Sequence, residues 1–204
     1  MKYISHLDIN RVMQRALRRS GLPIWYSQGF NPHPYITFAL PLSLGFASEY
    51  ECMDFRLTQE VDFDSIVDSM NQVLPDGLET FYAGEPKEEI AAITKADYQI
   101  RFFETETELL KESIQSFLNQ PEIITYKKTK KGKDKRILIN HMIYQYTFFE
   151  QPTELILAIT LSAGNQMCNP NLLLKTYQAE CKKNLPHYEV TRTMIYGMDN
   201  QKFL

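Results

Sequence analysis

The chain has 204 residues and a mass of 23.9 kDa, which gives room for one large domain or two small ones. Its hydrophobic fraction of 44% is typical of a globular protein, and its net charge of −3 argues against a protein that coats nucleic acid with its whole surface. No apolar run resembles a signal peptide or approaches the roughly 20 residues of a membrane span, so we expect a soluble, cytoplasmic protein.

The charges are unevenly distributed along the chain. Residues 1–50 hold five basic and two acidic residues, residues 60–122 hold four basic and fifteen acidic ones, and residues 127–136 hold seven basic and one acidic. Local anion binding is therefore compatible with the acidic total. The cysteines Cys52, Cys168 and Cys181 are odd in number and form no CxxC pair. This argues against a disulfide framework or a structural zinc site and fits a reducing compartment.

The first half of the chain predicts the element order β-α-β-β-α-β, with one strand beyond that order between its two helices. We expect strands at 3–5, 22–26, 35–40, 50–57 and 78–82, the second and third of them flanking a polar loop. Asp8 is the expected N-cap of a helix whose apolar face holds Ile9, Val12, Met13, Ala16 and Leu17. Gly21 and Pro23 end that helix. A second amphipathic helix is expected at 63–74, followed by a turn at 75–77.

After a linker at 85–95 the pattern repeats with one extra strand. We expect strands at 98–103, 123–128, 137–149, 155–161 and 188–196, and helices at 106–118 and 170–181, the latter with Pro170 at its start. The sequence thus predicts an α+β protein of two tandem ferredoxin-like units, residues 1–84 and 96–204. No repeat of individual residues supports the duplication, so it rests on element order.

Four arginines lie on or beside one face of the first helix. Arg11, Arg15 and Arg18 follow i, i+4, i+7 spacing opposite the apolar face, and Arg19 adjoins them. Guanidinium groups match phosphate oxygens, so the stripe is a candidate RNA-binding surface. A solvated helix face is the alternative, and Arg18 and Arg19 also suit a helix C-terminus.

The segment 27–34, SQGFNPHP, concentrates special residues. Pro32 and Pro34 stiffen it, and Gly29 permits a positive φ. We expect its polar and aromatic side chains to read a substrate, with His33 as a candidate general acid or base. A turn in which Asn31 caps the backbone and Phe30 fills the core is the alternative. The candidate binding residues of this loop are Ser27, Gln28, Phe30, Asn31 and His33.

Three further features have both a functional and a structural interpretation. His6 and Asp8 are weak candidates for a metal site with His33, against Asp8 as a simple N-cap. Lys130 and Lys131 lie in the basic turn 127–136, which suits phosphate contact or solubility. Gly164 and Asn169-Pro170 precede a helix, and Arg192 lies in the otherwise apolar last strand. In a tandem fold the end of the second unit can return to the site of the first, so Arg192 either faces that cleft or is a satisfied buried arginine. No motif specifies a reaction.

Residues 3–57 hold a dense set of motifs, and two later marks stand at Asn169-Pro170 and Arg192-Thr193. The motifs are 3–8 (YISHLD), 15–19 (RALRR), 21–23 (GLP), 26–34 (YSQGFNPHP), 38–42 (FALPL) and Gly45. In these residues the chain resembles the bacterial radical SAM-linked protein family, a domain of unknown function (DUF2344), and the resemblance extends more loosely to the end of the chain. Its architecture is more distantly similar to CRISPR repeat-processing RAMP endoribonucleases.

This resemblance implies a radical SAM protein as partner. A radical SAM enzyme holds its 4Fe–4S cluster on a CxxxCxxC motif, which this chain lacks. The resemblance therefore implies an accessory role with no cofactor in this chain, the partner carrying the cluster and SAM. Three hypotheses remain open: a protein that recognises RNA or a ribosome-associated substrate, a metal-independent endoribonuclease using His33 near Ser27 or Tyr26, and a module that only docks on the partner.

Overall fold

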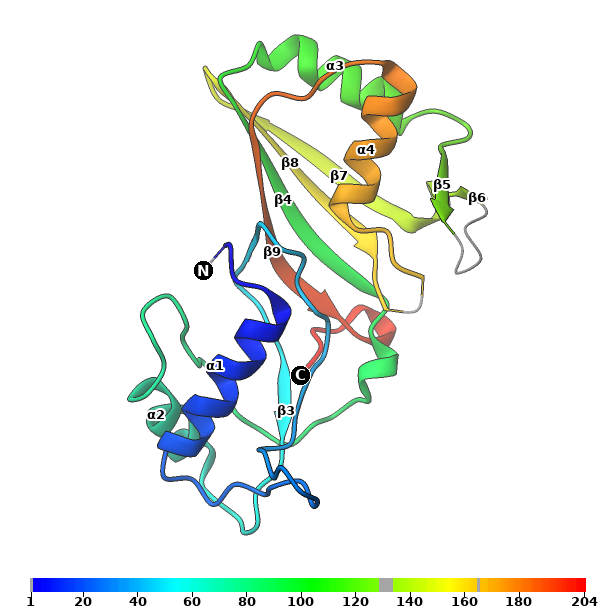
Figure 1. Cartoon of the computed structure of the whole chain (residues 1–204). Coiled ribbons are helices and arrows are strands. Elements are labelled where there is room, and N and C mark those ends of the chain that lie inside the picture. The colour runs from blue at the N-terminus through cyan, green and yellow to red at the C-terminus, as the bar shows by residue number, and fades with distance from the viewer. Residues whose placement is uncertain (1, 129–133, 165) are drawn as a thin grey trace. The chain divides into compact units, whose positions relative to one another are not determined.

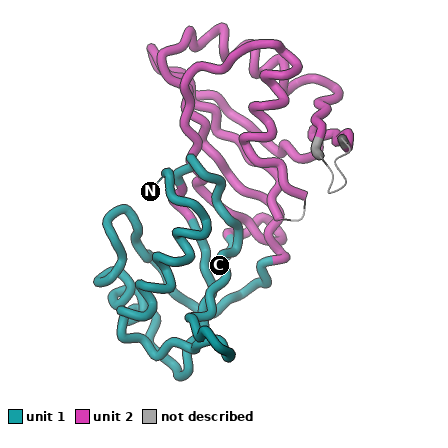
Figure 2. The backbone as a smooth tube through the Cα atoms, in the orientation of Figure 1, with its two compact units in different colours: residues 1–47, 51–90, 203–204 teal, residues 48–50, 91–202 magenta. Residues whose placement is uncertain are grey.

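The computed structural model describes residues 2–128, 134–164 and 166–204 (Figure 1). The chain forms two compact units (Figure 2). The first comprises residues 1–47, 51–90 and 203–204, and the second comprises residues 48–50 and 91–202. The boundary after Ile90 lies within the segment 85–95 that we interpreted as a linker. The described residues form four α-helices and nine strands, so the α+β class is confirmed.

The first unit is built from two helices and a short two-stranded ribbon. Its helices are α1 (His6–Arg19) and α2 (Phe63–Asn71). Strands β1 (Ile36–Phe38) and β3 (Met53–Phe55) pair antiparallel with Ile36 opposite Phe55. Apolar side chains from both helices and both strands form one core, which includes Ala16 and Leu17 of α1, Ile66 and Met70 of α2, and the strand residues Ile36, Met53 and Phe55.

Three of the strands predicted for this unit are absent from the structure, so these predictions were wrong. Residues 3–5 form no strand, because Ser5 is the N-cap of α1. Residues 22–26 contribute only the isolated bridges Ile24–Leu57 and Tyr26–Pro34. Residues 78–82 form no strand, because the side chain of Asn71 both donates to the Thr80 carbonyl and accepts from its N–H, each at 2.8 Å. Backbone groups satisfied in this way need no neighbouring strand.

The strand expected at 50–57 shortens to β3, and that at 35–40 shortens to β1. The turn at 75–77 is present, with the N–H of Leu78 donating to the carbonyl of Pro75. The first unit therefore does not show the order β-α-β-β-α-β, and two tandem ferredoxin-like units are not confirmed. An unexpected strand, β2 (Phe46–Ser48), precedes β3.

The second unit contains long strands and two helices. Its strands are β4 (Lys95–Phe103), β5 (Ile124–Lys128), β6 (Asp134–Leu138), β7 (Ile143–Glu150), β8 (Glu154–Ser162) and β9 (Tyr188–Tyr196), and its helices are α3 (Thr107–Leu118) and α4 (Pro170–Cys181). Short 3₁₀ turns lie at Ile90–Ala92, Asn140–Met142 and Met198–Asn200. The main sheet has the order β2-β9-β4-β8-β7, in which Ser48 of β2 belongs to this unit, and β5 pairs with β6 apart from it.

Alternating burial along β4 defines the covered face of this sheet. Ala96, Tyr98, Ile100 and Phe102 are buried, whereas Gln99 and Arg101 between them are exposed. The α3 helix packs against β7 and β8 and also contacts α4 (Figure 1). One face of the sheet is thus an apolar core that the helices cover, which is the arrangement expected for an antiparallel sheet.

One expected strand of the second unit is divided in two. The segment 137–149 is interrupted at Asn140, whose side-chain oxygen accepts from the N–H of Ile123 at 2.6 Å and whose amide donates to the Gln120 carbonyl at 2.9 Å. The predicted bounds of α4 and β9 agree with the structure. No helix within the described ranges is both long and apolar enough to cross a membrane.

Gly164 follows β8 in a conformation that only glycine adopts readily. Its φ is +70°, and an added Cβ would lie 2.3 Å from the backbone oxygen of Ile93. We predict that Gly164→Ala lowers the free energy of unfolding by more than the roughly 1–2 kcal/mol of the left-handed backbone alone, measured by urea denaturation with circular dichroism. Gly21→Ala is the control, because Gly21 has φ +75° and nothing within 4 Å. Equal losses in the two variants would contradict the contact.

Candidate functional site

The α1 arginines are exposed on the side of the helix away from the core. Arg11 forms an ion pair with Asp8 at 2.9 Å, and both side chains are more than half exposed. Within the described residues, Arg15, Arg18 and Arg19 have no ion-pair partner. These three guanidinium groups are therefore available to an external anion. Because none of the acids that the structure describes pairs with them, they are the more basic part of the stripe.

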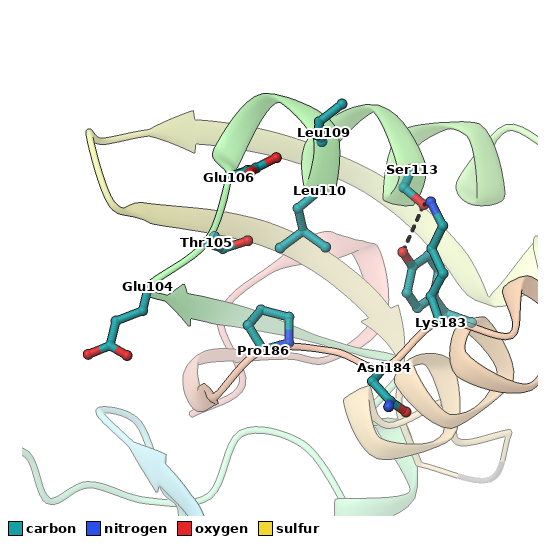
Figure 3. Close-up of a pocket in the computed structure, with 10 residues that line it drawn as sticks. Glu104, Thr105, Glu106, Leu109, Leu110, Ser113, Lys183, Asn184 and Pro186 are labelled. Carbon is teal, nitrogen blue, oxygen red and sulfur yellow. Dashed lines mark hydrogen bonds between the residues drawn. The ribbon is translucent and has the colours of Figure 1, made fainter.

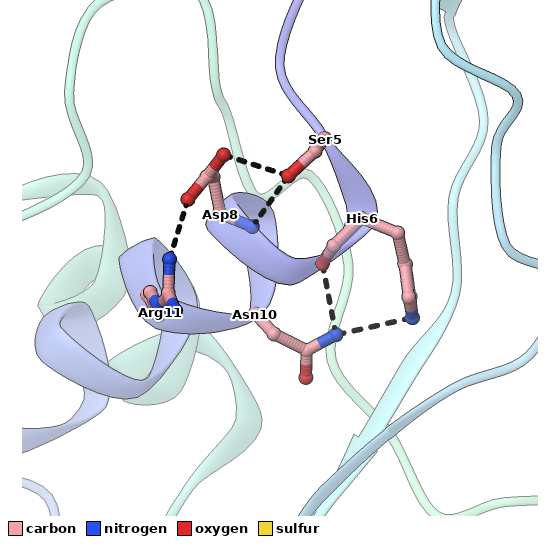
Figure 4. Close-up of polar contacts among 5 residues, drawn as sticks. All are labelled: Ser5, His6, Asp8, Asn10 and Arg11. Atoms are coloured by element: carbon pink, nitrogen blue, oxygen red, sulfur yellow. Dashed lines mark hydrogen bonds and ion pairs between the residues drawn. The ribbon is translucent and has the colours of Figure 1, made fainter.

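The start of α1 is held by a small polar network (Figure 4). The Ser5 hydroxyl oxygen accepts from the N–H of Asp8 at 3.1 Å, and the hydroxyl donates to the Asp8 carboxylate at 2.6 Å. Ser5, and not Asp8, is thus the N-cap, and Asp8 lies in the first helical turn. The hydrogen bond from Ser5, followed by that from Arg11, holds the pKa of Asp8 below its ordinary value of 3.8.

These contacts also bear on the metal site considered for His6 and Asp8. His6 Nε2 lies 3.1 Å from the side-chain nitrogen of Asn10, and the His6 ring packs edge-on against Phe38. No group of three His, Cys, Asp or Glu side chains in the described part of the chain could hold a metal ion. The His6 and Asp8 side chains instead have structural partners at the helix N-terminus.

The loop after Trp25 is a closed, hydrogen-bonded structure. The bridge between Tyr26 and Pro34 closes its base, and the Ser27 N–H donates to the His33 carbonyl at 2.9 Å. The Ser27 hydroxyl oxygen accepts from the His33 N–H at 3.2 Å and lies 3.1 Å from His33 Nδ1. Gly29 has φ +131°, which other residues rarely adopt. The backbone of the loop is therefore fixed at both ends.

The His33 ring is oriented by the same loop. Its Nδ1 lies 3.0 Å from the carbonyl oxygen of Asn31, which can only accept a hydrogen bond. This contact places the ring proton on Nδ1 and leaves a lone pair on Nε2. His33 is exposed, so Nε2 can accept a proton or a hydrogen bond from a bound molecule.

The remaining loop side chains point to solvent. Phe30 is fully exposed, with a relative accessibility of 106%, and Gln28 and Asn31 are also exposed. Phe30 therefore does not fill the core, which removes the structural alternative considered for it. A fully exposed phenylalanine on a fixed loop is available for stacking.

An aromatic cluster that the sequence did not predict lies at the base of the loop. The rings of Trp25 and Tyr35 meet edge to face with centroids 6.1 Å apart. The guanidinium carbon of Arg56 lies 4.8 Å from the Tyr35 centroid and 5.8 Å from that of Trp25. We call Trp25, Tyr35 and Arg56 the aromatic platform. Arg56 follows β3, far from the loop in sequence, so no local pattern could reveal it.

The platform and the α1 arginines lie on opposite sides of the first unit's core. Ile24, Ile36 and Phe55 turn toward the core, so their chain neighbours Trp25, Tyr35 and Arg56 turn away from it. The α1 arginines face away from the same core on the helix side. Within the described residues, no hydrogen bond, ion pair or ring contact joins the arginines to the loop. The structure thus presents two separate surfaces where the sequence suggested one.

The other candidate residues belong to the second unit. Arg192 is 1% exposed and lies in register with Tyr98, whose side chain is also buried. It therefore lies on the same buried face of the sheet as Tyr98, where a ligand from solvent does not reach it. Lys130 and Lys131 lie outside the described residues. Gly164 and Asn169 have structural roles, the latter as N-cap of α4 through a 2.9 Å bond from the Leu172 N–H.

The second unit also has a shallow pocket that the sequence did not indicate (Figure 3). It has a volume of about 320 Å³ and lies between the start of α3 and the segment after α4. Lys183 Nζ donates to Ser113 Oγ at 3.1 Å, and Ser113 Oγ lies 2.8 Å from the Tyr177 hydroxyl. Because the ammonium group is a donor here and not a base, Ser113 is not activated as a nucleophile.

The fold and these surfaces describe a two-unit α+β protein with an exposed, internally bonded loop of polar and aromatic side chains. A family model described as "Uncharacterized protein conserved in bacteria (DUF2344)" matches residues 1–170. The chain therefore belongs to the DUF2344 family. A search of curated proteins found no match.

The lowered pKa of Asp8 predicts an acid-dependent contribution to stability. A carboxyl group whose pKa is lower in the folded than in the unfolded protein stabilises the folded state. This stabilisation is complete above the pKa of the unfolded protein and is lost as the pH falls through the pKa of the folded protein. We predict that Ser5→Ala raises the Asp8 pKa more than Arg11→Gln does, as measured by NMR titration, because the Ser5 bond is the larger cause. The reverse order would contradict this assignment.

The contact between Ser113 and Tyr177 predicts a stability loss in the second unit. Tyr177 is 2% exposed, so Ser113→Ala leaves its hydroxyl buried without that partner. The expected cost is about 1–3 kcal/mol in urea unfolding. Ser116→Ala on the exposed side of the same helix is the control and should be near neutral. Adding Tyr177→Phe to Ser113→Ala should recover part of the loss. A fully additive double variant would contradict the coupling.

Proposed function

We propose that this protein recognises RNA, or a ribosome-associated substrate, on behalf of a radical SAM enzyme. The observation that carries the proposal is the loop 27–34, in which hydrogen bonds between Ser27 and His33 fix the backbone while Gln28, Phe30 and Asn31 are exposed. A fixed loop with an exposed ring, two side-chain amides and one imidazole suits contacts to unstacked bases. In this proposal Gln28, Asn31 and His33 read base edges or phosphates.

The α1 arginines supply the electrostatic part of this function. Arg15, Arg18 and Arg19 are exposed without acidic partners among the described residues, so each can pair with a phosphate through its planar fork. These arginines face away from the core on the side opposite the platform. In this proposal they bind the phosphates of a longer RNA that passes around the unit, or of a second segment of the same RNA.

The proposed role of the second unit follows from its element order. Without the β5–β6 hairpin, its elements run β-α-β-β-α-β with the antiparallel order β9-β4-β8-β7, which we interpret as one ferredoxin-like unit. The inserted hairpin leads to the basic turn 127–136, which in this proposal adds a contact to phosphates. The likeness in architecture to RAMP endoribonucleases is an analogy of fold.

The radical SAM partner is proposed from the sequence resemblance. The three cysteines of this chain lie in separate places: Cys52 before β3, Cys168 before α4 and Cys181 at the end of α4. Cys168 is fully buried, and burial raises its pKa to about 12, so it stays a thiol and not a metal-binding thiolate. In this proposal the cluster and SAM belong to the partner, and this chain supplies substrate recognition.

We predict that Arg15→Glu with Arg18→Glu weakens RNA binding and makes its salt dependence shallower. Each lost phosphate contact reduces the slope of log K against log salt by about 0.7 for single strands, so two contacts reduce it by about 1.4. The measurement is anisotropy of labelled RNA at several salt concentrations. Lys87→Glu with Lys175→Glu is the matched control, since both lysines are exposed and lie outside the proposed surfaces.

Unchanged affinity and salt slope in the Arg15/Arg18 variant would remove the helix from the proposal. If the protein binds no RNA but is recovered with a radical SAM protein from its native bacterium after nuclease and high salt, then docking on the partner is its function. Crosslinking of the tagged protein to RNA in that bacterium identifies the substrate if RNA recognition is correct.

A second candidate function is metal-independent RNA cleavage. The observation that favours it is the contact between Ser27 and His33, in which the loop orients the imidazole and leaves Nε2 exposed. An imidazole in this state can remove a proton from a ribose 2′-hydroxyl. Cleavage of RNA in the presence of a chelator, lost in His33→Ala, would favour this function over recognition alone.

A further inference from the structure

The aromatic platform of the first unit is assembled from three separate segments of the chain. The N–H of Trp25 donates to the Arg56 carbonyl at 2.9 Å, and the N–H of Tyr35 donates to the Trp25 carbonyl at 3.4 Å. These backbone bonds hold the segments before the loop, after the loop and after β3 side by side. The three platform side chains are therefore positioned by the fold and not only by contact with one another.

The platform remains accessible. Tyr35 is 40% exposed, Arg56 is exposed, and Tyr26 at the base of the loop is also 40% exposed. Phe30 at the loop tip is fully exposed. Aromatic groups thus occupy both the base and the tip of one loop whose backbone is fixed by the Ser27 and His33 hydrogen bonds.

Arg56 is the charged member of this surface. It makes no ion pair among the described residues, and its guanidinium group is already stacked against two rings. A stacked, planar guanidinium loses little conformational freedom when it pairs with an oxyanion. The nearest acid in sequence on the same strand face is Asp54, which is half-buried, whereas the Arg56 side chain is exposed. Arg56 is therefore the group of the platform that a phosphate would meet.

We infer that this surface binds single-stranded RNA, with an unpaired base stacked on Phe30, a second packed on the exposed part of Tyr35 in the platform, and an intervening phosphate paired with Arg56. This inference rests on the proposed function and specifies its substrate class. Bases in a duplex stack on one another and do not offer their faces to a protein, whereas bases of a single strand do. Stacking also tolerates any base, because every base has a π-face.

A single tryptophan makes the inference directly measurable. Trp25 is the one tryptophan of the chain, and it belongs to the platform, so its fluorescence reports on the surface itself. The probe is an unstructured single-stranded RNA oligonucleotide of mixed sequence, compared with the same strand annealed to its complement. Binding is followed in parallel by anisotropy of the labelled strand, which detects RNA bound anywhere on the protein.

We expect the single strand to change Trp25 fluorescence and the duplex to bind much more weakly. Phe30→Ala should weaken binding of the single strand by about 5- to 150-fold, the equivalent of one lost stacking contact, whereas Phe30→Tyr should retain it. Arg56→Gln should weaken binding as well. Tyr3→Ala is the control, because Tyr3 is an 81% exposed aromatic residue of the same unit outside this surface. Phe30 is fully exposed, so the two Phe30 variants should fold normally and carry the test.

Two outcomes would overturn the inference while leaving RNA recognition intact. In the first, anisotropy shows that the single strand binds, but Trp25 fluorescence is unchanged and Phe30→Ala keeps full affinity. In the second, the duplex binds as tightly as the single strand. If neither form raises the anisotropy, the proposed function itself is wrong, and the inference is wrong with it.

Discussion

Burial of one face of α1 is the constraint on which the first unit depends. Its ribbon pairs only three residues of β1 with three of β3, and a two-stranded ribbon of this kind is at best marginally stable alone. Ala16 and Leu17 of α1, with Ile66 and Met70 of α2, give it the apolar surface that it needs. The loop 27–34 lies between Ile24 and Ile36, which both pack in this core. Helix packing therefore holds the base of the loop in place, and the hydrogen bonds between Ser27 and His33 fix its backbone.

The same core gives the first unit two different surfaces. A helix that buries one face must expose the other, and a ribbon that buries Ile36 and Phe55 must expose the side chains that alternate with them. The helix presents arginines, and the ribbon presents the aromatic platform. The helix side thus carries arginines, whereas the ribbon side carries aromatic rings together with Arg56, which suits a ligand that offers both phosphates and bases.

The second unit has a different source of stability. Its central strand β4 pairs along its length with both β8 and β9, and its covered face is nearly all apolar. Arg192 and Tyr177 are the large polar side chains in this core that are almost fully buried, and Tyr177 has a hydroxyl partner in Ser113. Long paired strands over a helical layer form a self-sufficient core, so this unit does not need a ligand or a metal to explain its fold.

The sequence by itself determined the four helices and the long strands β4, β8 and β9, because periodic burial of side chains is a local property of the chain. It also identified the loop 27–34, since proline and glycine act on the backbone where they stand. The predictions of a strand at 78–82 and of an unbroken strand at 137–149 were wrong. The side-chain amides of Asn71 and Asn140 bind backbone groups there, and the local sequence pattern does not reveal such contacts.

Only the tertiary structure decided how the candidate side chains are distributed. It buried Arg192 in the sheet, exposed Phe30 to solvent, and separated the α1 arginines from the aromatic platform. It also brought Arg56 onto Trp25 and Tyr35. These outcomes depend on which face of each element is buried against another, and on segments distant in sequence, so no spacing within the chain could have fixed them.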